Sequence, residues 1–244
     1  MGVFRLSVCV PLCQLESLMA HPLINVETEM RHVVRKIGGT VLEDQFEKPP
    51  LFQNADFIFD SRKVVAELKI FTEDNFRSSA NDAKATNLWR RYHAKKLVSD
   101  PTPNERDWQA LPRAYQNEIY KAQTRPIQKR VREAHAQVRE TKARFGKSDY
   151  AGMLIVANDG ITSITPTALI GAVHLWAMKP DFPEFRHFVF LTANLLSVWP
   201  QERVAQYLWV SFDLEKGPPI DDGFLDELRE AWKTHHHGLT GYSG

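Results

Sequence analysis

The sequence predicts an α/β protein in which a central sheet is flanked by helices. Segments with the composition of strands alternate along the chain with segments that have helical periodicity, which is the pattern of α/β domains. The chain has 244 residues, of which 43% are hydrophobic and 25% are charged. A chain of this length can bury a full hydrophobic core. Its composition excludes disorder, collagen-like repeats and coiled coil as descriptions of the whole chain.

One helix and three strands are expected in the first part of the chain. Across residues 23–39, apolar side chains recur at helical spacing, and the pair Gly38 and Gly39 ends the pattern. Short segments rich in β-branched and aromatic residues follow, which is typical of strands. The expected strands are residues 40–44, 49–60 and 63–71.

The middle of the chain is expected to be mostly helical. Residues 85–98 and the stretch from Arg113 to Phe145 are expected to form helices, whereas residues 100–108 contain two prolines and are expected to form a loop. Because proline removes a helical hydrogen bond, we expect the longer helix to be interrupted near Pro126. Gly146 would supply its C-cap.

The last third of the chain alternates again between strands and helices. Residues 152–158 form an apolar run with the length of a buried strand, and residues 165–180 are expected to form a helix that ends before Pro180. The remaining expected elements are strands at 185–194 and 208–214 and a terminal helix at 221–237.

These elements divide the chain into three parts. We expect residues 1–20 to be an N-terminal extension, residues 21–200 to be the core, and residues 201–244 to be a strand and a helix packed on that core. The two cysteines, Cys9 and Cys13, are too few for a disulfide framework, which favours a reducing, cytoplasmic setting. No apolar run reaches the roughly 18 residues that a membrane-spanning helix needs.

Charge is distributed unevenly, although the formal net charge is only +1. Residues 84–147 contain 16 lysines and arginines and 6 acidic residues, while the rest of the chain contains 15 basic and 24 acidic residues. A basic block in an otherwise acidic chain indicates a polyanionic partner. A solvated helix surface without a partner is the alternative interpretation.

The segment 54–71 carries the candidate chemistry. If it folds as a hairpin that turns at residues 61–62, or through a four-residue loop over 60–63, Asp56 lies directly opposite Glu67. The Cβ atoms of such a pair lie about 4.5–5.5 Å apart, and like charges there are destabilising. A divalent cation between the carboxylates would replace this repulsion by coordination, and Mg²⁺ suits a few carboxylates plus water and phosphate. A bulge would shift the register and weaken the inference.

Two further side chains are expected at this site. The two-residue period of a strand places Lys69 on the same face as Glu67, where its amine can orient a water molecule or stabilise negative charge developing at phosphorus. On the preceding helix, Glu27 falls at the margin of the buried stripe, while Glu29 faces away from it. We therefore expect Glu27 to reach the site and Glu29 to be solvated.

The complete pattern resembles the PD-(D/E)XK nuclease superfamily, which includes restriction endonucleases and archaeal Holliday-junction resolvases. It consists of an Asp, ten residues and then Glu-x-Lys across a hairpin, behind a helix that bears a Glu. The matching residues are Asp56, Glu67, Lys69 and Glu27, and Ala55 stands where a proline often precedes the motif Asp. The resemblance implies a restriction-endonuclease-like mixed central sheet flanked by helices.

The resemblance also implies a metal-dependent nuclease that hydrolyses phosphodiester bonds in nucleic acid, with DNA as the expected substrate. Asp56 and Glu67 would bind Mg²⁺, with Mn²⁺ as a possible substitute, and the Leu68 carbonyl would be a further ligand. Glu27 would bind a second ion or a metal-bound water, and Lys69 would assist the attacking water.

In proteins of this type a polar side chain on a later helix faces the site. Gln137 is the best match for it, and Lys142 is a weaker one. The basic segment would neutralise backbone phosphates, which gives affinity without sequence information. Its expected phosphate contacts are Arg125, Lys129, Arg130, Arg132, Arg139 and Lys142. Cutting both strands of a duplex needs two sites, which favours a homodimer or a partner subunit.

Two other functions stay open. One is a nuclease fold that binds nucleic acid or a partner protein without cleaving anything. The other is a structural or interaction protein whose helical middle docks another subunit. The complete set of Asp56, Glu67 and Lys69 argues against binding without cleavage, because a module that does not cut has no need for two facing carboxylates.

Overall fold

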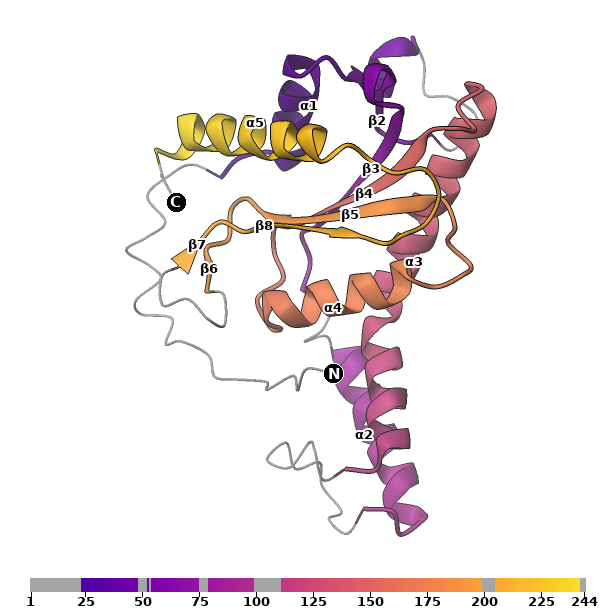
Figure 1. Cartoon of the computed structure of the whole chain (residues 1–244). Helices are drawn as coiled ribbons and strands as arrows, with labels where there is room; N and C mark the ends of the chain where they lie inside the picture. The colour runs from indigo at the N-terminus through magenta and orange to yellow at the C-terminus, as the bar shows by residue number, and fades with distance from the viewer. Residues whose placement is uncertain are drawn as a thin grey trace.

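A mixed sheet forms the centre of the molecule (Figure 1). The computed structural model describes residues 23–47, 52, 54–74, 79–98, 111–198 and 205–241, and the expected extension 1–20 and loop 100–108 lie outside these ranges. Within the described residues, the main sheet has six strands in the order β1 (Thr40–Val41), β2 (Phe57–Phe59), β3 (Val64–Phe71), β4 (Ala151–Asn158), β5 (Phe185–Thr192) and β8 (Trp209–Asp213). Strands β3, β4 and β5 are parallel, and the other neighbours are antiparallel. The expected α/β class is therefore confirmed.

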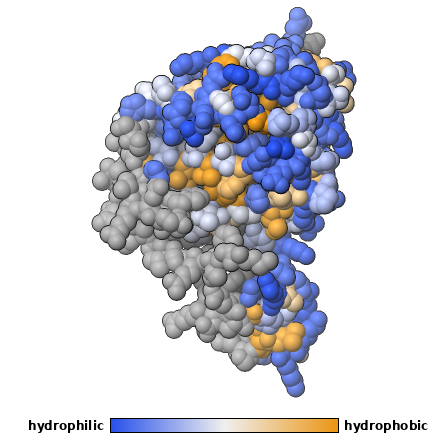
Figure 2. All heavy atoms as spheres, viewed as in Figure 1, coloured by the Kyte–Doolittle hydropathy of each residue, from blue (hydrophilic) through white to orange (hydrophobic). Residues whose placement is uncertain are grey.

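Two short strands, β6 (Ser197–Val198) and β7 (Ala205–Gln206), pair with each other outside this sheet. Figure 2 shows that hydrophilic side chains cover much of the visible face, while hydrophobic ones gather in a band between α5 and α4. No helix in the described part of the chain is long and apolar enough to span a membrane.

Helices cover both faces of the sheet and form two separate cores. On one face, α1 (Val26–Lys36) and α5 (Asp222–Thr240) pack on apolar side chains that include Ala66 and Leu68 of β3. On the other face, α3 (Arg113–Arg144) and α4 (Pro166–Ala177) pack on side chains that include Val65. Since side chains alternate along a strand, Glu67 and Lys69 share the α3 face with Val65.

The first helix is positioned by its cap and by its apolar stripe. The Asn25 side chain accepts a hydrogen bond from the Thr28 amide at 3.0 Å. Of the expected apolar stripe, Val26, Met30, Val33 and Val34 are buried and Ile37 is partly buried. The prediction that Glu29 is solvated is wrong. Its carboxylate is only 19% exposed and lies 2.6 Å from His235 Nε2, because α5 packs beside α1 and covers that side of the helix.

The hairpin has the expected register. Phe57 lies opposite Ala66, and Phe59 lies opposite Val64. The turn is a 3₁₀ segment over Asp60–Arg62 followed by Lys63 at φ 51°, which corresponds to the four-residue loop. The left-handed backbone at Lys63 closes the turn without the glycine that a tight hairpin prefers. Strand β2 is shorter than expected, because pairing with β3 begins at Phe57.

The long helix continues through its proline, contrary to the expected interruption near Pro126. It spans 32 residues, or about 48 Å at 1.5 Å per residue. Tertiary contacts on both sides compensate for the missing hydrogen bond. The Thr124 hydroxyl accepts from Trp176 Nε1 at 3.2 Å, and Ile127 is fully buried in the core.

The part of α3 before Pro126 packs against α2 (Ser79–Ala94) and extends beyond the sheet (Figure 1). We call the described residues 79–98 and 111–125 the arm. Buried aromatic and aliphatic side chains form a small separate core in it, with Tyr115 in edge-to-face contact with two aromatic rings. The members of this core are Trp89, Tyr92, Val98, Tyr115 and Ile119.

Candidate functional site

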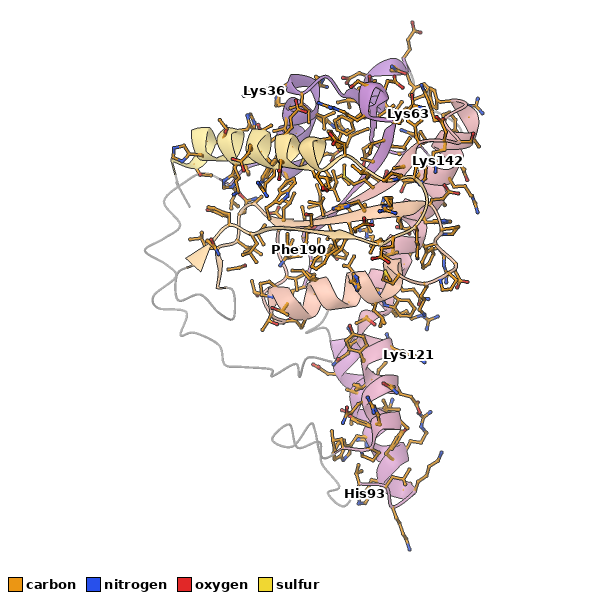
Figure 3. The ribbon with its side chains drawn as sticks, viewed as in Figure 1. Lys36, Lys63, His93, Lys121, Lys142 and Phe190 are labelled. Carbon is orange, nitrogen blue, oxygen red and sulfur yellow. The ribbon has the colours of Figure 1, made fainter. Side chains whose placement is uncertain are left out.

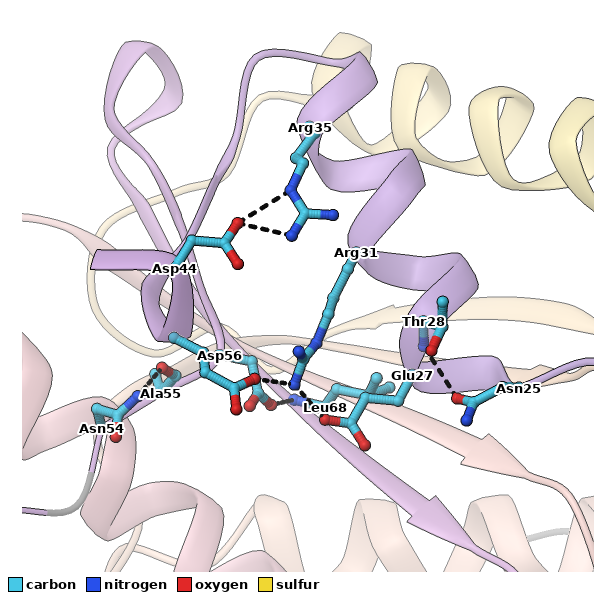
Figure 4. A network of polar contacts seen from close by, with 11 residues as sticks. Asn25, Glu27, Thr28, Arg31, Arg35, Asp44, Asn54, Ala55, Asp56 and Leu68 are labelled. Atoms are coloured by element: carbon cyan, nitrogen blue, oxygen red, sulfur yellow. Dashed lines mark hydrogen bonds and ion pairs between the residues drawn. The ribbon is translucent and has the colours of Figure 1, made fainter. Parts of the chain in front are cut away.

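Two carboxylates face each other at the start of the hairpin. Asp56 directly precedes β2, so the pairing of Phe57 with Ala66 continues to Asp56 opposite Glu67. The Leu68 amide donates a hydrogen bond of 2.8 Å to Asp56 Oδ2, which fixes this carboxylate beside β3 (Figure 4). The arrangement is the facing pair that the hairpin register predicts.

Glu67 is the most deeply buried member of the pair, with 1% of its side chain exposed. Its Oε1 accepts a hydrogen bond of 2.5 Å from Lys69 Nζ, while its buried Oε2 has no hydrogen-bond partner among the described residues. Burial raises the pKa of Glu67 well above its usual range, and the negative charge of Asp56 raises it further. Burial also raises the pKa of Asp56, against the lowering effect of its bond from the Leu68 amide.

This pair has the chemistry of a cation site. A buried carboxylate with one oxygen unpartnered, beside a second carboxylate, is electrostatically unfavourable unless a proton or a cation lies between them. Hard divalent cations such as Mg²⁺ prefer carboxylate oxygens together with water. Asp56 and Glu67 therefore fit a divalent cation, and the unpartnered Oε2 is the observation that supports the fit.

Lys69 is held in place from two sides. Its Nζ donates to Glu67 Oε1 and, at 2.6 Å, to Gln137 Oε1 on α3. The other end of the Gln137 amide donates to the Asn54 carbonyl at 2.9 Å. Gln137 thus connects α3, the lysine and the segment that leads into Asp56. The structure brings together Asp56, Glu67 and Lys69, as the hairpin register predicts, and Gln137, as the resemblance implies.

Sequence reasoning missed Thr141, which supports the same segment. Its hydroxyl accepts a hydrogen bond of 2.7 Å from the buried Ala55 amide. Thr141 lies one helical turn after Gln137, so the two side chains hold successive residues, Asn54 and Ala55, against α3. The four-residue spacing of two polar residues on an otherwise buried face was the available signal.

The structure does not bring Glu27 into a cluster of three acids. Its carboxylate lies 2.5 Å from Arg31, one turn further along α1, and is 54% exposed. Arg31 also pairs with Glu43, and Figure 4 shows its side chain extending from α1 toward the region of Asp56 and Leu68. In the described ranges, no three His, Cys, Asp or Glu side chains form a group that could hold a metal ion. Glu27 is close enough for its charge to contribute to the raised pKa of Asp56.

The expected role of Glu27 as a metal ligand is therefore not supported by this geometry. The reason is local: Arg31 follows Glu27 at the four-residue spacing that favours a helical ion pair. The Leu68 carbonyl as a further ligand remains a prediction, while the Leu68 amide has a defined role as a donor to Asp56.

One of the expected phosphate contacts is wrong. Lys142 is buried, with 9% of its side chain exposed, and pairs with Glu184 at 2.6 Å. It is therefore unavailable to nucleic acid and does not replace Gln137 at the site. The other five expected contacts are exposed on α3: Arg125, Lys129, Arg130, Arg132 and Arg139. Only Arg130 lies close to the direction of Gln137, because residues seven positions apart differ by about 20° around a helix.

Comparisons with known proteins add no assignment: no family model, no curated protein and no solved structure matches this chain. The fold and the site together define an α/β protein with a buried carboxylate pair and a lysine oriented by a glutamine.

Proposed function

We propose that this protein is a metal-dependent nuclease of the PD-(D/E)XK type that hydrolyses phosphodiester bonds, with DNA as its expected substrate. The proposal includes a restriction-endonuclease-like arrangement of the mixed sheet. The observation that carries it is the unpartnered Oε2 of Glu67 beside Asp56 on the α3 face of β3. The resemblance of the Asp-Glu-x-Lys pattern and the contact between Lys69 and Gln137 support it.

Each residue has a defined part in the proposed chemistry. Asp56 and Glu67 would hold Mg²⁺, with Mn²⁺ as a possible substitute. When bound, the ion would polarise a phosphoryl oxygen and lower the pKa of a coordinated water. Lys69 would donate hydrogen bonds to the attacking water or to the phosphoryl oxygens. Gln137 would fix the direction of the lysine amine.

The metal-binding step is tested by calorimetric titration of the metal-free protein with Mg²⁺ and with Mn²⁺. We expect binding to the wild type and loss of binding in Glu67→Gln, because this substitution removes one of the two ligand charges. Glu227→Gln is the control for loss of one carboxylate charge, since Glu227 is exposed on α5, where it pairs with Arg62 at 2.8 Å. Equal binding by the wild type and by Glu67→Gln would contradict the assignment.

The cleavage step is tested with supercoiled plasmid, linear duplex, junction and single-stranded substrates, each in Mg²⁺ and in EDTA. We expect Mg²⁺-dependent cleavage that is abolished by Glu67→Gln and by Lys69→Met. Lys36→Met, on the exposed surface of α1, is the control for loss of one lysine charge. If the wild type and both site variants cleave equally, the activity belongs to another site or to a contaminant.

A second candidate function is nucleic-acid binding without cleavage. The observation in its favour is that Arg31 forms an ion pair with the carboxylate of Glu27, so that two acids, and not three, converge among the described residues. The same experiments separate the candidates. Salt-dependent DNA binding with no cleavage in either Mg²⁺ or Mn²⁺ would favour the second one.

A further inference from the structure

A stripe of cations follows the outer side of α3, away from the candidate site. At 100° per residue, the four stripe positions fall within about 40° of one another around the helix. Their mean direction differs by about 140° from that of Gln137. All four side chains are exposed. The stripe consists of Lys121, Arg125, Arg132 and Arg139.

The stripe carries one sign of charge along its length. Gln128 and Ala136 occupy the positions between its cations, so no acidic or large apolar side chain interrupts it. None of the four cations forms an ion pair with another described residue, whereas Lys129 and Arg130, outside the stripe, lie 3.8 Å from Glu133. The stripe runs from Lys121 to Arg139, about 27 Å along the helix axis.

The arm extends this surface onto a second helix. Lys84 of α2 lines the same shallow depression as Ala122, which lies between Lys121 and Arg125 in sequence. Arg91 also lines it but forms an ion pair there with Glu118. Figure 3 shows Lys121 on the part of α3 beyond the sheet, with His93 near the far end of α2. The described residues of the arm contain eight lysines and arginines and two acidic residues.

Direction and length point to one kind of partner. A surface turned about 140° from Gln137 does not face the phosphate that the candidate site would hold. A duplex carries one phosphate per about 1.7 Å of axis, so a straight row of unpaired cations about 27 Å long lies beside many phosphates. The absence of large apolar residues on the described stripe excludes the apolar face that an interfacial membrane helix needs.

We propose that the stripe, with Lys84, binds the backbone of a nucleic-acid segment that does not pass through the Asp56–Glu67 site. The choice of nucleic acid rests on the proposed function, while the position of the surface rests on the geometry of α3. The surface anchors a second part of the substrate, such as a distant stretch of a long duplex or another branch.

Binding in EDTA tests this proposal without cleavage. The probe is a fluorescein-labelled 30-base-pair DNA duplex, followed by fluorescence anisotropy at several salt concentrations. The stripe variant changes Lys121, Arg125, Arg132 and Arg139 to Gln. The control changes Arg35, Lys36, Arg229 and Lys233 to Gln, which removes the same formal charge from α1 and α5 on the opposite face of the sheet. Three of these cations form ion pairs, so the single variant Lys36→Gln is measured beside it. Circular dichroism confirms that the variants fold.

We expect the stripe variant to bind more weakly and to reduce the slope of log K against log salt by about 3–4, since each lost phosphate contact removes about 0.9. The control variant keeps the slope of the wild type. An unchanged slope in the stripe variant, or an equal change in the control, overturns the proposal. Binding to phosphatidylserine vesicles is measured as well. If the stripe variant loses vesicle binding but retains duplex binding, the surface binds lipid and the proposal is overturned.

The outcomes distinguish this proposal from the proposed function. If the stripe variant loses salt-dependent binding while no protein cleaves DNA in Mg²⁺ or Mn²⁺, the anchoring surface stands and the nuclease assignment fails. If the wild type cleaves and the stripe variant binds and cleaves a long duplex unchanged, the anchoring surface fails. If the anchoring surface and the nuclease assignment are both correct, the stripe variant has a higher KM on long duplex and an unchanged kcat.

Discussion

The buried carboxylate pair predicts that Glu67→Gln stabilises the metal-free protein. Glutamine keeps the volume of the side chain and an oxygen that accepts from Lys69 Nζ. It also replaces the unpartnered Oε2 by an amide that can donate to Asp56. The substitution removes one of two like charges from a buried site without creating a cavity.

The size of this stabilisation depends on pH. The raised pKa of Glu67 means that the folded protein binds its proton more tightly than the unfolded chain does. The free energy of unfolding therefore falls as the pH rises from the ordinary carboxyl range, about 4, through the raised pKa. The glutamine side chain of the variant does not titrate, so its free energy of unfolding does not show this decrease with rising pH.

The magnitude follows from the cost of an unsatisfied buried acceptor. That cost is about 1–3 kcal/mol and is larger for a charged group. At pH 8 without metal, we expect the free energy of unfolding to rise by about 1–3 kcal/mol, or about 2–12 °C in Tm for a chain of this size. In the wild type, Mg²⁺ at about 100 times its Kd would raise the free energy of unfolding by about 2.7 kcal/mol. The variant would not be stabilised by Mg²⁺.

The assay is thermal and urea unfolding between pH 5 and 9, in EDTA and in Mg²⁺, with Glu227→Gln as the control. We expect the free energies of unfolding of the wild type and the variant to be similar at pH 5 and to differ at pH 8, where the variant is more stable. A variant that is less stable than the wild type at pH 8 in EDTA would refute the reasoning, because Glu67 would then gain more from Lys69 than it loses through burial.

Three further predictions concern side chains around the site and along α3. Gln137→Leu removes one of the two contacts that hold Lys69, so we expect DNA cleavage to fall by about 10- to 100-fold; an unchanged rate would show that the lysine is oriented without it. Lys142→Met leaves Glu184 unpaired in a partly buried position, so we expect urea unfolding to show a loss of about 1–3 kcal/mol with an unchanged salt slope of DNA binding; a reduced slope would show that Lys142 contacts phosphate. Pro126→Ala restores a donor in the middle of α3, so we expect a gain of about 1–3 kcal/mol in urea unfolding, and a loss of stability would show that the helix needs the proline at this position.

The strand pairing at the site could be predicted from the sequence because strands have a strict two-residue period. Once the turn is placed at residues 60–63, counting outward from it places Asp56 opposite Glu67, and the two-residue period places Lys69 on the same face as Glu67. The register therefore depends on local chemistry alone, and the structure confirms it.

The predictions that failed depend on contacts between distant segments. The covering of Glu29 by His235 requires the position of α5, and the continuity of α3 at Pro126 requires contacts with α4 and the core. The burial of Lys142 depends on Glu184, a residue 42 positions away. The pairing of Glu27 with Arg31 is the exception, since its four-residue spacing is visible in the sequence.

The continuity of α3 has a mechanical consequence. Lys121 and Gln137 lie 16 residues apart on one unbroken helix, about 24 Å along its axis. A rigid helix moves as one body. If a ligand bound to the arm tilts α3, the Gln137 amide that orients the Lys69 amine therefore moves too, unless the helix bends at Pro126. Bending at Pro126 would therefore allow the arm to bind a ligand without changing the orientation of Lys69.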